Sequence, residues 1–400
     1  MMAARAIIEG LRSGVPYLDT ADVMTFGRKR TIDAVESLME TVSSGRRPKS
    51  WGYVLRAEYG QGKTHLLYAL AGVAAAQNWL VSMVTVSKET PLDRLDFLYP
   101  KIINNTYRPG SSQPGLESVI REAVEAPHLA AEARELVLSD RVRIVLDNLI
   151  RQDAGFDELV ADLHGQFLPA AQLKQFYREN YKKTVKFPTV PMRLEVPHYL
   201  ALVDWLIGRT EYRGWLILFD EVELLGKFGR GGRARGYANI GRFLSGTGTR
   251  TASVWALAGN FQTDVIIQRK EHEFIPLWFD THPKDADNKE LALNALDELA
   301  AAKPLDMLPP KDLKELLSQI LMLHQDAFNW TAAVDVDQFY EAVRRAMQIF
   351  DPRLRTWVRV ALTLLDMWFQ YPEGNADIQT HGLKEVDLDE DAEMDEMENI

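Results

Sequence analysis

The chain has 400 residues, of which 46% are hydrophobic and 26% charged, so we expect a folded protein with one large and one smaller domain, or two to three ordinary domains. It contains no cysteine, which excludes a disulfide framework, a thiolate zinc site and a catalytic cysteine. No signal-peptide pattern opens the sequence, and no apolar stretch approaches the roughly 18 residues of a membrane span. We therefore expect a cytoplasmic protein without a membrane segment.

The charge is unevenly distributed along the chain. The net charge is −11, but residues 385–400 carry nine acidic residues and no basic one, so the rest of the chain is close to neutral. Such a run is typical of a solvated end, and we predict a disordered acidic tail over 372–400. The alternative is a tail that competes with nucleic acid for a basic groove, or that docks on a basic partner.

The first part of the chain passes from helical spacing to strand patterns. Helical spacing covers residues 5–13 and about 30–42. An apolar run at 51–57 is typical of a strand; a glycine-containing loop and the helical stretch 65–77 follow, and 78–87 is a second strand candidate. This order of strand, loop, helix and strand predicts the opening of a parallel α/β sheet.

The remaining pattern combines a helical insertion, two further strands and a helical end. Residues from about 110 to 208 read as amphipathic helices, interrupted by an extended segment at 187–197. The unbroken apolar runs 215–221 and 253–260 predict strands that are buried on both faces. From residue 303 the pattern is helical again. 

The predicted fold is therefore α/β, with a parallel sheet flanked by helices. We expect four parts in chain order: an N-terminal helical segment (1–50), an α/β domain (51–302) that contains the insertion, a C-terminal helical lid (303–371) and the acidic tail.

The stretch RAEYGQGKTHLL, residues 56–67, predicts a phosphate loop (residues 57–64) of the Walker A type. Gly60 and Gly62 permit a tight backbone, Lys63 supplies charge for the β and γ phosphates, and Thr64 supplies a hydroxyl for Mg²⁺. A helix that begins at about His65 would add its N-terminal N–H groups. The further candidates for contact with the nucleotide are Ala57, Tyr59, Gln61 and His65.

Ala57 stands where the usual pattern has its first glycine. Alanine adds one methyl group, and we expect it to be tolerated if its φ is negative.

A second element supports nucleotide hydrolysis. The strand at 215–219 ends in Asp220 and Glu221, which fits the Walker B pattern. A buried strand that ends in two carboxylates could hold Mg²⁺ through Asp220 and orient or deprotonate the attacking water through Glu221. An ordinary strand that ends in a charged turn is the alternative when this stretch is considered alone.

Two further residues have positions that suit a nucleotide site. Asn260 follows the strand at 253–260 and could position the water; a simple turn residue after Gly259 is the alternative. Pro352 suits the first turn of a helix, so Arg353 near its start could reach a nucleotide; a surface cation is the alternative.

Weaker candidates lie elsewhere in the chain. The stretch 226–237 reads as a flexible, glycine-rich loop that could contact nucleic-acid phosphates or supply an arginine to a neighbouring subunit, through Arg230, Arg233 or Arg235. A solvated loop is the alternative. His272, Glu273 and His282 have no familiar metal-ligand spacing, and we interpret them as surface residues.

Together these elements resemble AAA+ ATPases of the origin-recognition type, which are P-loop NTPases, and more specifically the ATP-binding proteins of BREX bacteriophage-defence systems. The likeness is carried by RAIIEGLRSGVP (5–16), TFGRKRTIDAV (25–35), AEYGQGKTHLL (57–67), FDEVELL (219–225), AGN (258–260) and DPRLR (351–355). Ala57 and Asn260 depart from the pattern, since related proteins have glycine and threonine there, but neither change removes a group that hydrolysis requires.

The resemblance implies roles for particular residues. Arg28 belongs to a Gly–Arg box near the adenine, Asn260 takes the place of the first sensor, and Arg353 is the sensor arginine of the lid. It further implies ATP and Mg²⁺ as cofactors, a homo-oligomer whose trans-acting arginine no motif assigns, and partner proteins of the defence system, among them a helicase, acting on DNA.

Three functions remain open at this point. The first is an ATP-hydrolysing AAA+ motor or switch. The second is a nucleotide-gated scaffold or loader with little turnover of its own. The third is a DNA-binding regulator whose ATP site sets oligomerisation.

Overall fold

The computed structural model describes residues 2–13, 22–350 and 352–371. The predicted acidic tail lies outside the described residues. The chain forms two compact units: unit 1 takes its described residues from 1–29, 59–69 and 306–400, and unit 2 consists of 30–58 and 70–305.

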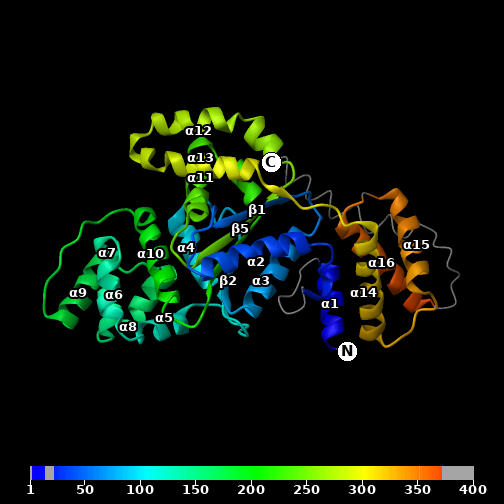
Figure 1. Ribbon diagram of the computed structural model, residues 1–400, viewed down its shortest axis with the longest axis horizontal. Coiled ribbons are helices and arrows are strands. Elements are labelled where there is room, and N and C mark those ends of the chain that lie inside the picture. The colour runs from blue at the N-terminus through cyan, green and yellow to red at the C-terminus, as the bar shows by residue number, and fades with distance from the viewer. Residues whose placement is uncertain (1, 14–21, 351, 372–400) are drawn as a thin grey trace. The chain divides into compact units, whose positions relative to one another are not determined.

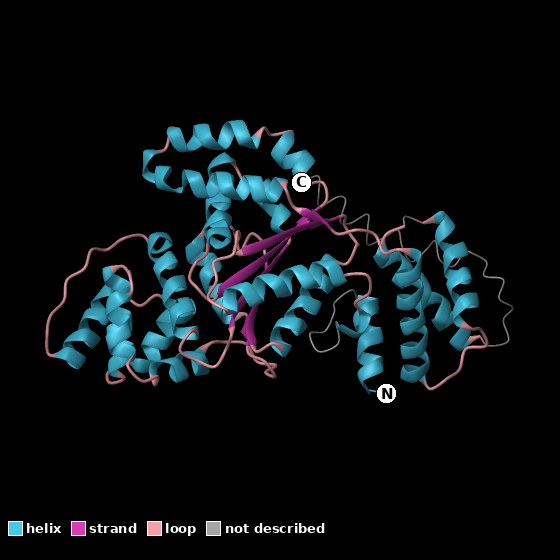
Figure 2. Cartoon of the chain, in the orientation of Figure 1, coloured by secondary structure: helices cyan, strands magenta, loops and turns pink. Residues whose placement is uncertain are grey.

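Unit 2 is built on a sheet, whose strands are magenta in Figure 2. Among the described residues it has six strands in the order β3-β2-β4-β5-β1-β6. They are β1 (Gly52–Ala57), β2 (Trp79–Thr85), β3 (Thr106–Tyr107), β4 (Gly214–Asp220), β5 (Thr251–Ala258) and β6 (Lys303–Pro304). The four long strands lie where the apolar runs predict them. The expectation of a parallel sheet is correct for five strands and wrong for β3, which pairs antiparallel with β2. A strand of two residues leaves no periodic pattern to detect.

The central strands of the sheet are buried on both faces, as their unbroken apolar runs predict. All seven residues of β4 and the first seven of β5 are buried. Phe219 of β4 stacks on Trp255 of β5 with ring centroids 3.9 Å apart, and Phe243 packs edge-on against Phe219. This aromatic cluster fixes β4 beside β5 and thereby sets where the two strands end.

Helices flank the sheet, and the insertion forms a bundle of its own within unit 2 (Figure 1). The α/β layers include α2 (Lys29–Ser43), α4 (Leu95–Asn104), α11 (Arg230–Ser245), α12 (Glu271–Asp280) and α13 (Lys289–Ala300). The insertion contains α5 (Glu117–Val124), α6 (Leu129–Glu132), α7 (Asp140–Arg151), α8 (Phe156–Ala161), α9 (Ala170–Tyr181) and α10 (Met192–Ile207). The helix that follows the phosphate loop is α3 (Lys63–Ala76).

Two segments of unit 2 are helical where the sequence predicts otherwise. The expected extended segment 187–197 is helical from Met192, because Pro191 precedes the first turn and the face with Val196 and Tyr199 is buried. The predicted glycine-rich loop 226–237 enters α11 at Arg230. Further along the same helix glycine serves packing: a Cβ on Gly241 would lie 1.9 Å from the carbonyl oxygen of Leu291, so only glycine lets α13 approach α11 so closely.

Unit 1 joins the N-terminal helix to the C-terminal helices (Figure 1). Its helices are α1 (Met2–Ser13), α14 (Pro310–Phe328), α15 (Val336–Ala346) and α16 (Leu354–Gln370), and α1 packs against α14 and α16. Ile8, Leu317 and Leu364 are fully buried in the shared core. Arg12 of α1 forms an ion pair of 2.5 Å with Asp366 of α16, which also contacts the buried His324.

Candidate functional site

The carboxyl ends of β1, β5 and β4 lie at one edge of the sheet in unit 2. Ala57 pairs with Ala258 at the end of β1 and β5, and Phe219 pairs with Trp255. Asp220 is buried at the end of β4, where its Oδ1 accepts a hydrogen bond of 2.9 Å from the N–H of Glu221. The packing of β4 therefore presents two consecutive carboxylates, one buried and one exposed, at this edge.

Glu221 has an unusual backbone conformation. Its φ is +55° and its side chain is exposed. A positive φ is uncommon for a residue other than glycine, and such residues concentrate at functional sites. The chain turns away from the strand directly after Asp220. The Asp220 carboxylate is therefore buried, whereas the Glu221 carboxylate is exposed to solvent.

Ala57 fits its position without backbone strain. It is the last residue of β1, is 3% exposed, and its φ is not positive. Alanine therefore meets the backbone condition that the sequence sets for this position.

The end of β5 carries two polar features. Asn260 is exposed and donates from Nδ2 to Oδ2 of Asp264 over 2.9 Å. A Cβ on Gly259 would come within 1.9 Å of Oε1 of Glu58, so the Glu58 side chain lies directly against this glycine. Sequence reasoning missed Glu58; the available signal was a carboxylate placed directly after β1.

The phosphate loop continues from β1 into unit 1 and has the backbone that its glycines predict. Gly60 has a φ of +76° and Gly62 a φ of +87°. Helix α3 begins at Lys63, earlier than the predicted His65, and the N–H of Leu66 donates to the Gly62 carbonyl over 3.0 Å. Lys63 and Thr64 therefore stand in the first turn of a helix, where N–H groups without helical partners favour an anion.

Arg28 contacts the phosphate loop from within unit 1. Its Nη2 donates to the carbonyl oxygen of Gln61 over 3.0 Å, and its Nη1 donates to that of Asp306 over 2.5 Å. Burial lowers the pKa of Arg28, while the carboxylates of Asp306 and Asp312 act in the opposite direction. Arg28 thus braces the main chain of the loop, a contact that the sequence pattern alone does not reveal.

The start of α16 lies against the same loop. Arg353 directly precedes the helix, and its guanidinium is 5.9 Å from the ring centroid of Tyr59. The sequence predicts Pro352 within the first turn of this helix. In the structure Pro352 precedes the first turn instead. A Cβ on Gly60 would lie 3.4 Å from Cβ and Cδ of Arg353, an ordinary contact distance, so glycine is favoured at this position by its φ of +76° and not by lack of space. 

The neighbouring contacts in unit 1 extend this arrangement. Nε2 of His65 lies 3.1 Å from Oγ1 of Thr25, which joins α3 to the Gly–Arg box. Unit 1 therefore brings together Arg28, the loop and Arg353, whereas Asp220, Glu221 and Asn260 belong to unit 2.

Comparison with known proteins finds a family to which the N-terminal part of the chain is similar. Residues 2–156 match the family model of the BREX system ATP-binding protein BrxC/D. The resemblance to BREX ATP-binding proteins is thereby confirmed, and it links the chain to phage defence and to ATP. The matched residues include Arg28 and the whole phosphate loop, and end before Asp220. Neither the curated proteins nor the solved structures give a match.

The basic stretch 226–237 divides into one buried and two more accessible arginines. Arg233 is 7% exposed and forms an ion pair of 2.7 Å with the fully buried Glu271. It is therefore unavailable to nucleic acid or to another subunit, which corrects the expectation for this residue. Arg230 lies 4.7 Å from the ring centroid of Phe274, and Arg235 contacts Asp93 and Trp278.

The histidines considered as metal ligands make other contacts. His282 stacks on Trp278 with centroids 4.2 Å apart, and His272 lies 3.8 Å from Asp297. Among the residues that the structure describes, no group of histidine and carboxylate side chains is arranged to hold a metal ion.

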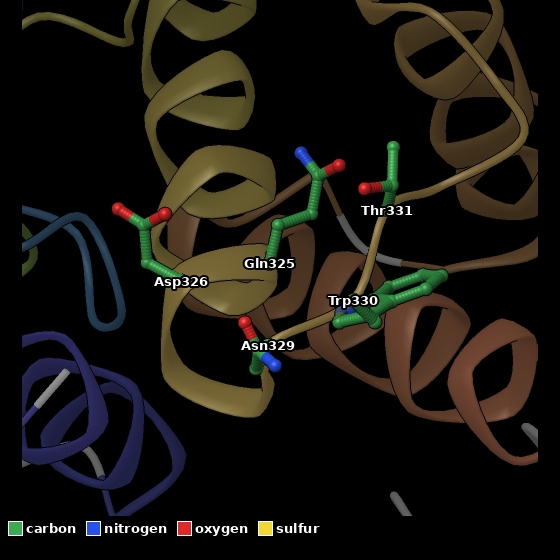
Figure 3. Close-up of a pocket in the computed structure, with 5 residues that line it drawn as sticks. All are labelled: Gln325, Asp326, Asn329, Trp330 and Thr331. Carbon is green, nitrogen blue, oxygen red and sulfur yellow. The ribbon is translucent and has the colours of Figure 1, made fainter.

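A pocket of about 470 Å³ opens at the end of α14 in unit 1 (Figure 3). It is lined by Gln325, Asp326, Asn329, Trp330 and Thr331, none of which is a predicted site residue.

No helix within the described ranges has the length and apolar composition to cross a membrane.

Proposed function

We propose that the protein is a P-loop ATPase of the AAA+ type that binds and hydrolyses Mg·ATP to switch its conformation within a BREX-like defence complex. The observation that carries the proposal is the backbone of the phosphate loop. Gly60 and Gly62 have positive φ directly before the first turn of α3, where Lys63 and Thr64 stand. Such a loop aims main-chain N–H groups at a polyphosphate.

Each chemical task of ATP hydrolysis has a candidate side chain. Lys63 would compensate the charge of the β and γ phosphates, and Glu221 would orient the attacking water and accept its proton. Thr64 and Asp220 supply the oxygen ligands that Mg²⁺ prefers, and a bound Mg²⁺ would neutralise charge on the phosphate oxygens. Asn260 would position the water, and Arg353 would couple the γ-phosphate to α16.

The electrostatic setting of the loop supports this assignment. Two helices begin beside it, α3 at Lys63 and α16 at Leu354, and each N-terminus adds a partial positive charge. Cδ2 of Leu354 would lie 3.5 Å from a Cβ on Gly62, so α16 begins in contact range of the loop. A triphosphate bound there would interact favourably with both helix ends.

ATP turnover by single-site variants tests the proposal. We expect Lys63→Ala and Glu221→Gln each to lower the rate of phosphate release by about 10²-fold or more, because each removes a group that acts on the transition state. Lys311→Ala and Glu122→Gln, which change exposed side chains, are the matched controls and should retain the parental rate. Parental turnover in both site variants would refute the hydrolytic assignment.

The same measurement separates the other candidate functions. ATP binding without turnover by the isolated chain, followed by turnover when DNA or partner proteins are added, would favour a nucleotide-gated scaffold or loader. A DNA-binding regulator requires salt-dependent binding to duplex or single-stranded DNA. A titration at two salt concentrations, with and without ATP, measures that property and asks whether Arg230 and Arg235 contribute. The change of oligomeric state with ATP is measured on the same samples.

A further inference from the structure

Two residues of unit 1, Tyr59 and Arg355, join α16 to the phosphate loop. Tyr59 is predicted only to contact the nucleotide, and Arg355 has no predicted role in ATP hydrolysis. Nη1 of Arg355 donates to the Tyr59 hydroxyl oxygen over 3.0 Å. The main-chain N–H of Arg355 donates to the Gly60 carbonyl oxygen, also over 3.0 Å. One residue of α16 therefore contacts two consecutive residues of the loop.

The main-chain contact is unusual for its place in the helix. Arg355 is the second residue of α16, and N–H groups of a first helical turn have no acceptor within their own helix. Here the acceptor comes from the phosphate loop. Because Gly60 needs its positive φ to present the next N–H groups to a phosphate, a hydrogen bond to its carbonyl also fixes the loop conformation.

The Tyr59 ring adds a second type of contact. Its face lies 5.9 Å from the Arg353 guanidinium, within the range of a cation–π interaction. Tyr59 thus contacts Arg353 through its ring and Arg355 through its hydroxyl. The Tyr59 side chain is 41% exposed, so these two polar contacts, and not burial alone, help to orient it.

We propose that Tyr59 and Arg355 are positioning residues that form a latch between the phosphate loop and the start of α16. The latch holds the loop in its phosphate-binding backbone and keeps Arg353 beside it before nucleotide arrives. This role rests on the proposed ATP function for its purpose, but the latch itself is a property of the nucleotide-free chain. It predicts that loop and α16 loosen together when either side chain is changed.

Hydrogen exchange on the nucleotide-free full chain tests the latch directly. The Arg355 amide should exchange more slowly than the intrinsic rate, although it lies in a first helical turn. Tyr59→Phe removes only the hydroxyl, and Arg355→Gln removes the guanidinium. Both variants should speed exchange at the amide of residue 355 and in the segment 59–64 by about three- to tenfold. This range corresponds to the loss of a single, partly exposed hydrogen bond. Arg355→Lys should restore part of the protection. Arg344→Gln, which breaks an exposed ion pair on α15, is the control.

Release of a fluorescent ATP analogue provides the functional measurement. Tyr59→Phe and Arg355→Gln should release the analogue about three- to tenfold faster than the parent, with the unfolding temperature unchanged. A merely structural role would lower the unfolding temperature as well. An Arg355 amide that exchanges at the intrinsic rate in the parent refutes the latch, as do parental release rates in both variants. If the parent itself binds no analogue, the proposed ATP function fails while hydrogen exchange still decides on the latch.

Discussion

Arginines meet different partners in the helical insertion of unit 2 and around the phosphate loop of unit 1. In the insertion, Arg141 is 8% exposed and pairs with the fully buried carboxylate of Asp162 over 3.0 Å. At the loop, Arg28 donates to two main-chain carbonyls and Arg355 to a tyrosine hydroxyl. Charged acceptors make strong, permanent contacts, whereas neutral acceptors make weaker ones. The first arrangement stabilises the packing of the bundle, and the second leaves positive charge beside the loop that we propose binds phosphate.

The carboxylate in the insertion is fully engaged. Asp162 Oδ2 accepts from the Tyr199 hydroxyl over 2.6 Å, and its Oδ1 also accepts from the N–H of Leu168 over 2.6 Å. Nε of Arg141 donates to the same Tyr199 hydroxyl over 3.0 Å. The network ties α7, α10 and the turn after α8 together, so its loss should affect the whole bundle.

The largest expected effect follows from breaking this network on one side. Arg141→Met leaves the Asp162 carboxylate buried without its cation, and we expect the free energy of unfolding to fall by about 3–5 kcal/mol. Arg121→Gln, which removes an exposed arginine of the same bundle, is the control and should leave the free energy of unfolding almost unchanged. Chemical denaturation measures both.

A combined variant then sharpens the meaning of that loss. Replacing Arg141, Asp162 and Tyr199 together by methionine, leucine and phenylalanine should recover most of the stability, because no buried charge or hydroxyl is left unpaired. If the triple variant is as unstable as Arg141→Met, the network contributes through shape and not through charge pairing.

An intermediate effect is expected at Asp204, a buried carboxylate whose partners are mostly neutral. It accepts hydrogen bonds from the N–H groups of Thr249 and Arg250 and from the Thr251 hydroxyl, and so ties α10 to the start of β5. Asp204→Asn replaces one acceptor oxygen by a donor, and we expect a loss of about 1–3 kcal/mol in the free energy of unfolding. An unchanged denaturation midpoint would show that the loop rearranges at no cost.

The pH dependence of stability offers a second measurement at Asp204. Burial raises its pKa above the ordinary value of 3.8, although its hydrogen bonds act in the opposite direction. The folded state therefore binds the proton more tightly than the unfolded chain, and the contribution of Asp204 to stability falls as pH rises from 3.8 through the folded-state pKa. Asp204→Asn should remove this component of the slope.

The smallest effect on stability is expected at Arg28. Arg28→Gln removes the guanidinium that donates to the Gln61 and Asp306 carbonyls, and we expect about 1 kcal/mol of destabilisation. Its effect on nucleotide affinity should be larger, near tenfold, because the phosphate loop loses a brace while the core remains intact. Isothermal titration with a non-hydrolysable ATP analogue, alongside denaturation, compares the two quantities. A loss of stability without any loss of affinity would place Arg28 with the structural arginines of unit 2.

Much of the frame could be predicted from local pattern. The apolar runs of β4 and β5 identify buried strands because a strand covered on both faces has no polar alternation. The glycines of the phosphate loop identify a backbone with positive φ because only glycine adopts it without strain. For the same reason Ala57, at the end of a regular strand, could be predicted as harmless.

Contacts between distant segments could not be predicted in this way. The sequence itself determines strand positions, the phosphate loop and its candidate side chains, since each depends on residues within a few positions. The tertiary structure decided that Gly241 serves helix packing, that Arg233 forms a buried ion pair with Glu271, and that α1 shares a core with α14 and α16. It also decided that Arg28 and Arg355 hold the loop. Those outcomes depend on which side chains meet across hundreds of residues, and local periodicity carries no information about that choice.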